Sequence, residues 1–112
     1  MTRRVVITGV GAVTPLGIGS DPLIDRWTAG ESGIEDGYGR CLDFEPADFL
    51  SKKEVRRADR FAQMAIVAGD EAVKQAFGSD GELPYDPYRV GCVIATGIGG
   101  LVSLEREQEK LI

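Results

Sequence analysis

Small and apolar residues predict one long helix in the middle of the chain, over residues 58–77. The small residues recur at intervals of three and four positions, which places them on one helical face. They are Ala58, Ala62, Ala65, Gly69, Ala72 and Ala76. Bulky apolar residues occupy the remaining sides until a polar cluster near the end of the segment. We therefore expect a helix that lies deep inside a larger body and that a neighbouring segment can approach closely.

Two β-branched runs, Arg4–Val10 and Arg89–Thr96, predict buried strands. Both are apolar on successive positions, which is typical of central strands covered on two faces. A glycine-rich loop and a helical pattern follow each run, and Ser20 is expected to cap the first helix, which ends at Gly30. Because strands and helices alternate, the sequence predicts an α/β fold with parallel strands. The last helical pattern, LVSLEREQEKLI, has no capping signal, so we expect a longer protein.

The overall composition indicates an ordinary globular domain with one local charge anomaly. The 112 residues are 43% hydrophobic and 28% charged, and the net charge of -5 argues against general nucleic-acid binding. Five of the 13 basic residues nevertheless crowd into positions 51–60, directly ahead of the apolar helix. They are Lys52, Lys53, Arg56, Arg57 and Arg60. This run is either a solvated helix end or a positive patch for an acidic partner or a phosphate.

The absence of histidine is the most informative count in the composition. It removes the usual general base of Ser-His and Cys-His catalysis and the commonest nitrogen ligand of metals. Cys41 and Cys92 have no metal-ligand spacing, and Cys92, in an apolar run, is expected to be an inert buried thiol in a reducing cytoplasm. The sequence therefore makes this chain alone a poor candidate for a complete active site, and no apolar run is long enough to span a membrane.

Two glycine-rich loops invite a ligand-binding interpretation. The first, GVGAVT at residues 9–14, lacks the third glycine of the dinucleotide fingerprint, which favours a structural turn over a nucleotide site. The second, Gly97-Ile98-Gly99-Gly100, joins the second predicted strand to the last helix. Its free backbone N–H groups could bind an anion, and it could equally be a close-packed turn.

Four motifs in order closely resemble the N-terminal part of elongating β-ketoacyl-acyl carrier protein synthases. They are RRVVITGVGAVTPLG, the Trp27 helix ending in AGESGI, SKKEVRRADRFAQMAIVAGDEA, and RVGCVIATGIGGL. The resemblance covers essentially the whole chain and about the first quarter of a family member.

The resemblance implies that residues 1–112 are part of an N-terminal β-ketoacyl synthase domain in a thiolase-like fold with α-β-α-β-α layers. The implied enzyme is a cytoplasmic, homodimeric acyltransferase of fatty-acid biosynthesis that needs no cofactor. It catalyses a decarboxylative Claisen condensation of an acyl thioester with malonyl-acyl carrier protein. Its catalytic cysteine and two histidines are expected downstream of this chain, so the fragment alone should be inactive. Its partners would be acyl carrier protein, a second copy and the remainder of its own chain, with no nucleic acid or membrane.

The resemblance also assigns roles to two groups of residues. Lys53, Arg56 and Arg57 match basic positions where acidic carrier protein docks at the mouth of the active-site tunnel. Ile98 matches a side chain that borders the acyl pocket, and its neighbours give the loop room to move. The implied substrate-binding residues are Gly97, Ile98, Gly99 and Gly100.

Two other functions remain open from the sequence. One is a non-catalytic, chain-length-determining partner subunit of the same fold, and the other is a nucleotide-binding α/β module. The stretch between Ile34 and Ser51 is irregular and shorter than in many members of the resembled family, so we expect a trimmed surface hairpin there.

Overall fold

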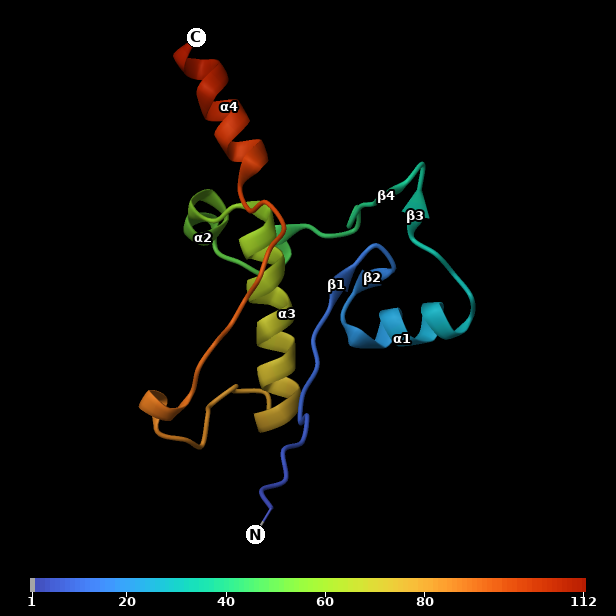
Figure 1. Cartoon of the computed structure of the whole chain (residues 1–112), viewed down its shortest axis with the longest axis vertical. Helices are drawn as coiled ribbons and strands as arrows, with labels where there is room; N and C mark the ends of the chain where they lie inside the picture. Colours follow the sequence, from blue (N-terminus) through green and yellow to red (C-terminus); the bar gives the residue numbers. More distant parts are fainter. Residues whose placement is uncertain (1) are drawn as a thin grey trace.

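The chain is organised around helix α3, Arg60–Phe77, in a computed structural model that describes residues 2–112 (Figure 1). Met1, the first residue of the predicted domain, lies outside the described residues. The N-terminal segment runs along α3, and helix α4 projects away from the far end. The radius of gyration is 16.9 Å, whereas a compact domain of this length would have roughly 13 Å. The molecule is therefore open rather than closed around one core.

Three of the helices begin and end close to where the local pattern places them. Helix α3 follows the predicted segment, and the other two match the helical patterns on either side of it. The helices of the chain are α1 Ser20–Thr28, α2 Lys52–Arg57, α3 and α4 Leu101–Leu111, with single 3-10 turns at Pro46–Asp48 and Pro87–Arg89. The basic run is a separate short helix, α2, that precedes α3.

The small-residue face of α3 lets the N-terminal segment pass very close to it. A Cβ at Gly9 would lie 3.0 Å from the Cβ of Ala76, and one at Gly11 would overlap the carbonyl oxygen of Ala68. The backbone N–H of Val10 donates a 2.7 Å hydrogen bond to Gln75 Oε1 of α3. The predicted close approach is confirmed, and it supports the interpretation of the first glycine loop as a structural turn.

Helix α1 is tied to α3 by a carboxylate rather than by its own cap. The backbone N–H of Ser20 donates to both oxygens of Glu71, at 2.8 and 3.1 Å. The expected cap at Ser20 is wrong: Gly19 is the N-cap, and Ser20 is the first helical residue. Glu71 caps the helix instead, because its carboxylate accepts the hydrogen bond of the Ser20 N–H group, which has no partner within the helix.

The buried apolar core of the described residues is small. It consists of Leu16, Phe44 and Val67. Phe44 stacks on Phe49 with ring centroids 6.0 Å apart, and the Arg60 guanidinium lies over the Phe44 ring, 5.3 Å from its centroid. Aromatic residues of the irregular stretch thus anchor it to the start of α3.

The two predicted buried strands are not strands within residues 2–112. Val5 is 94% exposed in the run Arg4–Val10, and Val93 is 95% exposed in the run Arg89–Thr96. A strand needs a hydrogen-bonded neighbour, and neither run has one among the described residues. For the same reason Cys92 is exposed, so the expectation of a buried thiol is wrong.

The strands that do form are two short antiparallel hairpins, not the predicted parallel sheet. They are β1 Val13–Thr14 with β2 Gly17–Ile18, and β3 Ile34–Glu35 with β4 Tyr38–Gly39. The second lies in the stretch between Ile34 and Ser51, where the sequence analysis expects a surface hairpin. The described chain is thus a small α/β piece in which helices predominate.

Helix α3 is also less deeply buried than its apolar pattern predicts. Only Gln63 and Val67 are buried along its length, and Ile66 is 46% exposed. The open neighbouring segments leave its bulky sides uncovered. None of the helices in residues 2–112 combines the length and apolar character needed to cross a membrane.

Candidate functional site

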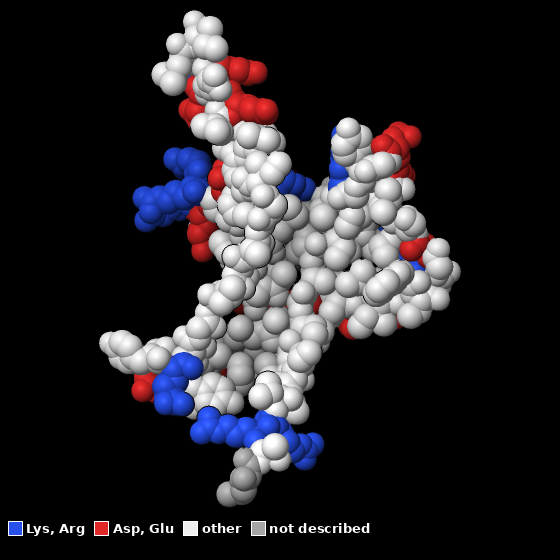
Figure 2. Space-filling model, in the orientation of Figure 1, with Lys and Arg blue, Asp and Glu red and all other residues white. Residues whose placement is uncertain are grey.

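The basic residues predicted to form a docking surface lie on helix α2. Figure 2 shows Lys and Arg side chains projecting from the position of α2 at the left of the molecule. Lys53, Arg56 and Arg57 are exposed. We call the exposed side chains of these three residues the basic surface.

A capping box fixes the start of α2. The backbone N–H of Glu54 donates to Ser51 Oγ at 3.2 Å, and the Glu54 carboxylate accepts from the Ser51 N–H at 2.8 Å. These reciprocal hydrogen bonds satisfy two N–H groups that a helix start otherwise leaves unpaired. The Ser51 backbone N–H, followed by the Ser51 side chain, lowers the pKa of Glu54 below its ordinary 4.5.

This lowered pKa predicts a pH-dependent start of α2. The folded-state pKa of Glu54 lies below its unfolded value, so the carboxylate stabilises α2 above pH 4.5 and loses this effect as pH falls through the folded-state value. The protection factors of the α2 amides, which are corrected for the intrinsic pH dependence of hydrogen exchange, should fall on acidification in that range. Glu54→Gln is the matched control, because glutamine keeps the capping bond without titrating. The same acid-induced loss of protection in Glu54→Gln would contradict the assignment.

Gln63 holds the end of α2 against the first turns of α3. Its side-chain amide is buried and donates to the carbonyl oxygens of Val55, at 3.0 Å, and Ala58, at 2.9 Å. Buried amides that satisfy backbone carbonyls fix geometry, because losing either bond leaves an unpaired polar group. The position of the basic surface is therefore set by α3.

The second glycine loop lies between an unpaired extended segment and helix α4. Gly99 has a φ of 74°, which favours glycine, and its N–H donates to Thr96 Oγ1 at 3.1 Å. A Cβ at Gly99 would lie 3.7 Å from the ring of Phe61 in α3. Gly100 is the N-cap of α4, and the Ile98 side chain is 73% exposed. The loop thus rests on α3 through its glycines and presents Ile98 outward.

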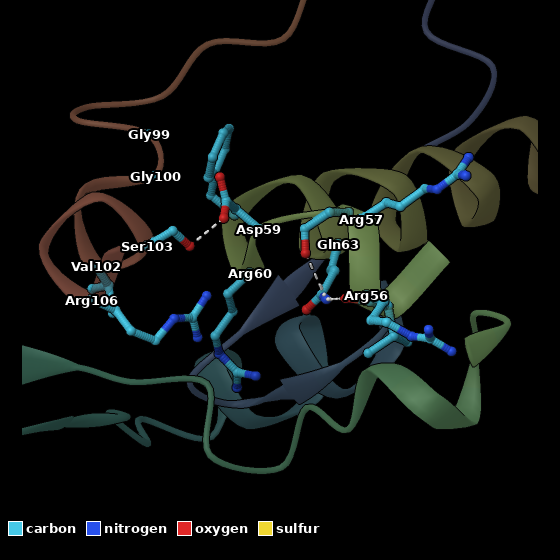
Figure 3. A pocket seen from close by; sticks show the side chains of 13 residues that line it. Arg56, Arg57, Asp59, Arg60, Gln63, Gly99, Gly100, Val102, Ser103 and Arg106 are labelled. Carbon is cyan, nitrogen blue, oxygen red and sulfur yellow. Dashed lines mark hydrogen bonds between the residues drawn. The ribbon is translucent and has the colours of Figure 1, made fainter. Parts of the chain in front are cut away.

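One pocket of about 530 Å³ brings part of the basic surface together with part of this loop (Figure 3). Arg56 and Arg57 line it from α2, and Gly99 and Gly100 line it from the loop. Lys53 does not line it; this residue borders a separate hollow together with Arg57. Gly97 and Ile98 are also absent from its lining. The structure therefore joins four of the seven predicted site residues.

The same pocket contains Asp59, Ser103 and Arg106, which the sequence did not single out for a role. Ser103 of α4 donates its hydroxyl hydrogen to Asp59 Oδ1, across the pocket wall. Arg60 and Arg106 add two more guanidinium groups, and Asp59 is the only acidic side chain in the lining. An aspartate just before an apolar helix is a recognisable N-cap signal, but nothing local in the sequence indicates its partner 44 residues away.

The Cys41 thiol, outside this pocket, has a shifted pKa. Burial raises the pKa of the Cys41 thiol, and the positive charge of Arg60 opposes this shift only in part. A raised pKa disfavours the reactive thiolate. Residues 2–112 contain no group of three or more His, Cys, Asp or Glu side chains placed to hold a metal ion.

Comparison with known proteins decides what kind of protein carries this site. Residues 2–111 match the family described as Beta-ketoacyl synthase, N-terminal domain. The chain belongs to the beta-ketoacyl synthase family. This membership confirms the resemblance carried by the four sequence motifs, and it implies a thiolase-like fold for the domain.

Relatives of this beta-ketoacyl synthase chain carry two kinds of name. The 3-oxoacyl-[acyl-carrier-protein] synthase 2 proteins of Synechocystis and of Staphylococcus aureus strain COL are each 38% identical to it, over 98% of this chain and 29% of their own length. A Streptomyces halstedii protein, provisionally named polyketide beta-ketoacyl synthase 1, is 38% identical over 96% of this chain and 28% of its own length. The chain thus spans less than a third of these relatives.

Proposed function

We propose that this chain is the N-terminal portion of a 3-oxoacyl-acyl carrier protein synthase of fatty-acid elongation. The observation that carries the proposal is the family match over residues 2–111, together with relatives named 3-oxoacyl-[acyl-carrier-protein] synthase 2. In the proposed reaction, an acyl group on an enzyme thiol is attacked by the carbanion that forms when malonyl-carrier protein loses carbon dioxide. The thiolate leaves, and the 3-oxoacyl product is two carbons longer than the acyl substrate.

The proposed domain continues beyond Ile112 and forms a layered α-β-α-β-α body that pairs as a cytoplasmic homodimer. The exposed runs Arg4–Val10 and Arg89–Thr96 support this, because their β-branched residues are suited to a sheet that further strands would complete. The absence of histidine supports placing the catalytic cysteine and histidines on that further part. The share of the relatives' length that the chain covers agrees with a partial domain.

Within this enzyme, the basic surface docks acyl carrier protein. Lys53, Arg56 and Arg57 are exposed on a helix that Gln63 and the Ser51 capping box hold in place. The basic surface contrasts with the net charge of -5 of the whole chain, so it would attract an acidic partner selectively to this face. The loop Gly97-Ile98-Gly99-Gly100 borders the acyl pocket, with the docking residues Arg56 and Arg57 lining the same hollow as Gly99 and Gly100.

Transfer of an acyl group tests this proposal against the non-catalytic partner subunit. The full-length protein should be incubated with palmitoyl-acyl carrier protein and examined by intact mass measurement. A synthase gains one acyl group as a hydroxylamine-sensitive thioester. A synthase from another source, which becomes acylated under the same conditions, is the positive control. If the protein is folded but gains no covalent acyl group, the result favours the non-catalytic partner subunit.

Ile98 is expected to set the acyl chain length in the full-length enzyme. Phenylalanine at this position adds bulk at the proposed pocket border, so Ile98→Phe should lower kcat/KM for myristoyl-carrier protein by about tenfold relative to hexanoyl-carrier protein. Ile98→Ala is the opposite control and should tolerate long chains at least as well as the wild type. An unchanged ratio in both variants would remove Ile98 from the pocket.

A further inference from the structure

We propose that Asp59 is a positioning residue that couples the carrier-docking helix to the acyl-pocket loop. This inference rests on the proposed function and adds to it a residue whose role is to hold two parts of the site in register. Asp59 occupies the junction between α2, which ends at Arg57, and α3, which begins at Arg60. The junction therefore connects the helix that carries the basic surface to the start of α3.

The Asp59 side chain does not form the helix cap that its position predicts. An aspartate at an N-cap ordinarily accepts hydrogen bonds from N–H groups in the first turn of its own helix. Asp59 is the N-cap of α3, yet its carboxylate makes no such bond. It accepts instead from the hydroxyl of Ser103 in the first turn of α4 (Figure 3). The helix thus forgoes a local cap in favour of a contact with another element.

The same carboxylate also rests against the glycine loop. A Cβ at Gly100 would overlap Asp59 Oδ2 and lie 3.1 Å from Cγ, so the carboxylate would have to shift to admit any other residue. A Cβ at Gly99 would lie 3.7 Å from the ring of Phe61, two positions after Asp59. The loop is therefore seated on the first turn of α3, with Asp59 fixing its C-terminal end.

A continuous series of contacts links docking to the pocket. The Gln63 amide binds the end of α2 to α3, and Asp59 binds the start of α3 to Ser103, with its carboxylate beside Gly100. A hydrogen bond to a charged group is stronger than one between neutral groups. Loss of the Asp59 contact frees the loop while leaving the guanidinium groups of Arg56 and Arg57 in place on α2. Acyl-chain selection then changes while carrier binding does not.

The test compares Ser103→Ala, Asp59→Ala, Asp59→Asn and the Ala/Ala double variant in the full-length protein. Measured quantities are kcat and KM for hexanoyl- and myristoyl-carrier protein, and the Kd for the carrier without an acyl group. Ser103→Ala should change the ratio of the two kcat/KM values at least about fivefold, with the carrier Kd unchanged. The double variant should be no worse than Asp59→Ala, and Asp59→Asn, which keeps an acceptor for Ser103, should retain the wild-type ratio.

Two outcomes overturn the coupling. They are an equal loss of activity on both substrates, which marks a merely structural contact, and unchanged selectivity in Ser103→Ala. Either outcome leaves the proposed function intact if the wild-type enzyme elongates both substrates. If the wild-type enzyme elongates neither substrate, the proposed function fails, and amide hydrogen exchange alone then tests whether Asp59 couples the two parts of the site. Ser103→Ala should then accelerate exchange at Gly99 and Gly100 but not in α1; unchanged exchange at the two glycines rejects it.

Discussion

Gly11→Ala is expected to lower the free energy of unfolding by about 3 kcal/mol, the upper end for overpacking a close contact. The added methyl group would overlap the carbonyl oxygen of Ala68 and lie 2.8 Å from its carbonyl carbon. Both atoms belong to the backbone of α3, so no side-chain rotation relieves the clash. The N-terminal segment must move off the helix, which also strains the hydrogen bond from Val10 to Gln75. Urea denaturation monitored by circular dichroism measures the change.

Gly69→Ala is the matched control for this prediction. Gly69 lies inside α3. Apart from its chain neighbours and the nearby backbone of the helix itself, no atom lies within 4 Å of a Cβ placed there. Alanine in a helix interior is favoured over glycine by about 1 kcal/mol, so this variant should be more stable than the wild type. Equal stability of Gly11→Ala and wild type would contradict the close packing of the N-terminal segment on α3.

Reversing two charges of the basic surface, in Arg56→Glu/Arg57→Glu, is expected to weaken association with acidic acyl carrier protein on the order of tenfold or more at low salt. Both side chains are exposed, so their attraction to the carrier is long-range and screened by salt. The double variant should therefore also show a flatter dependence of Kd on ionic strength. Isothermal titration at several salt concentrations measures both quantities.

Arg3→Glu/Arg4→Glu supplies a control with the same change in net charge. These arginines are exposed in the N-terminal segment, at the opposite end of α3 from α2 (Figure 1). The control should retain most of the affinity. Equal weakening by both double variants would show that only net charge matters, and unchanged affinity in Arg56→Glu/Arg57→Glu would reject the docking surface.

Features that depend on local periodicity could be predicted from the sequence. Helices α3 and α4 follow from apolar and small residues at intervals of three and four, and Gly30 follows the end of α1 as expected. The runs Arg4–Val10 and Arg89–Thr96 were predicted wrongly as strands. Their β-branched residues favour extended backbone, but a strand also requires a partner, and residues 2–112 do not supply one.

For the candidate site too, the local features could be predicted from the sequence and the long-range contacts could not. A basic run that contradicts the acidic balance of the chain is visible in the sequence, and so is a glycine loop before a helix. That Arg56 and Gly100 line one pocket depends on how α2 and α4 meet at the start of α3. The Asp59–Ser103 hydrogen bond could not be predicted, because no residue pattern specifies a pair 44 positions apart.

A condensation assay tests the proposed function with the full-length protein, acyl-acyl carrier protein and malonyl-acyl carrier protein, and mass spectrometry identifies the carrier-bound products. We expect a 3-oxoacyl-carrier protein two carbons longer than the acyl substrate, formed with release of one carbon dioxide and at a lower rate in Arg56→Glu/Arg57→Glu at limiting carrier concentration. Recovery of the acyl and malonyl groups unchanged, from a folded protein, would contradict the proposal that this chain belongs to a condensing enzyme.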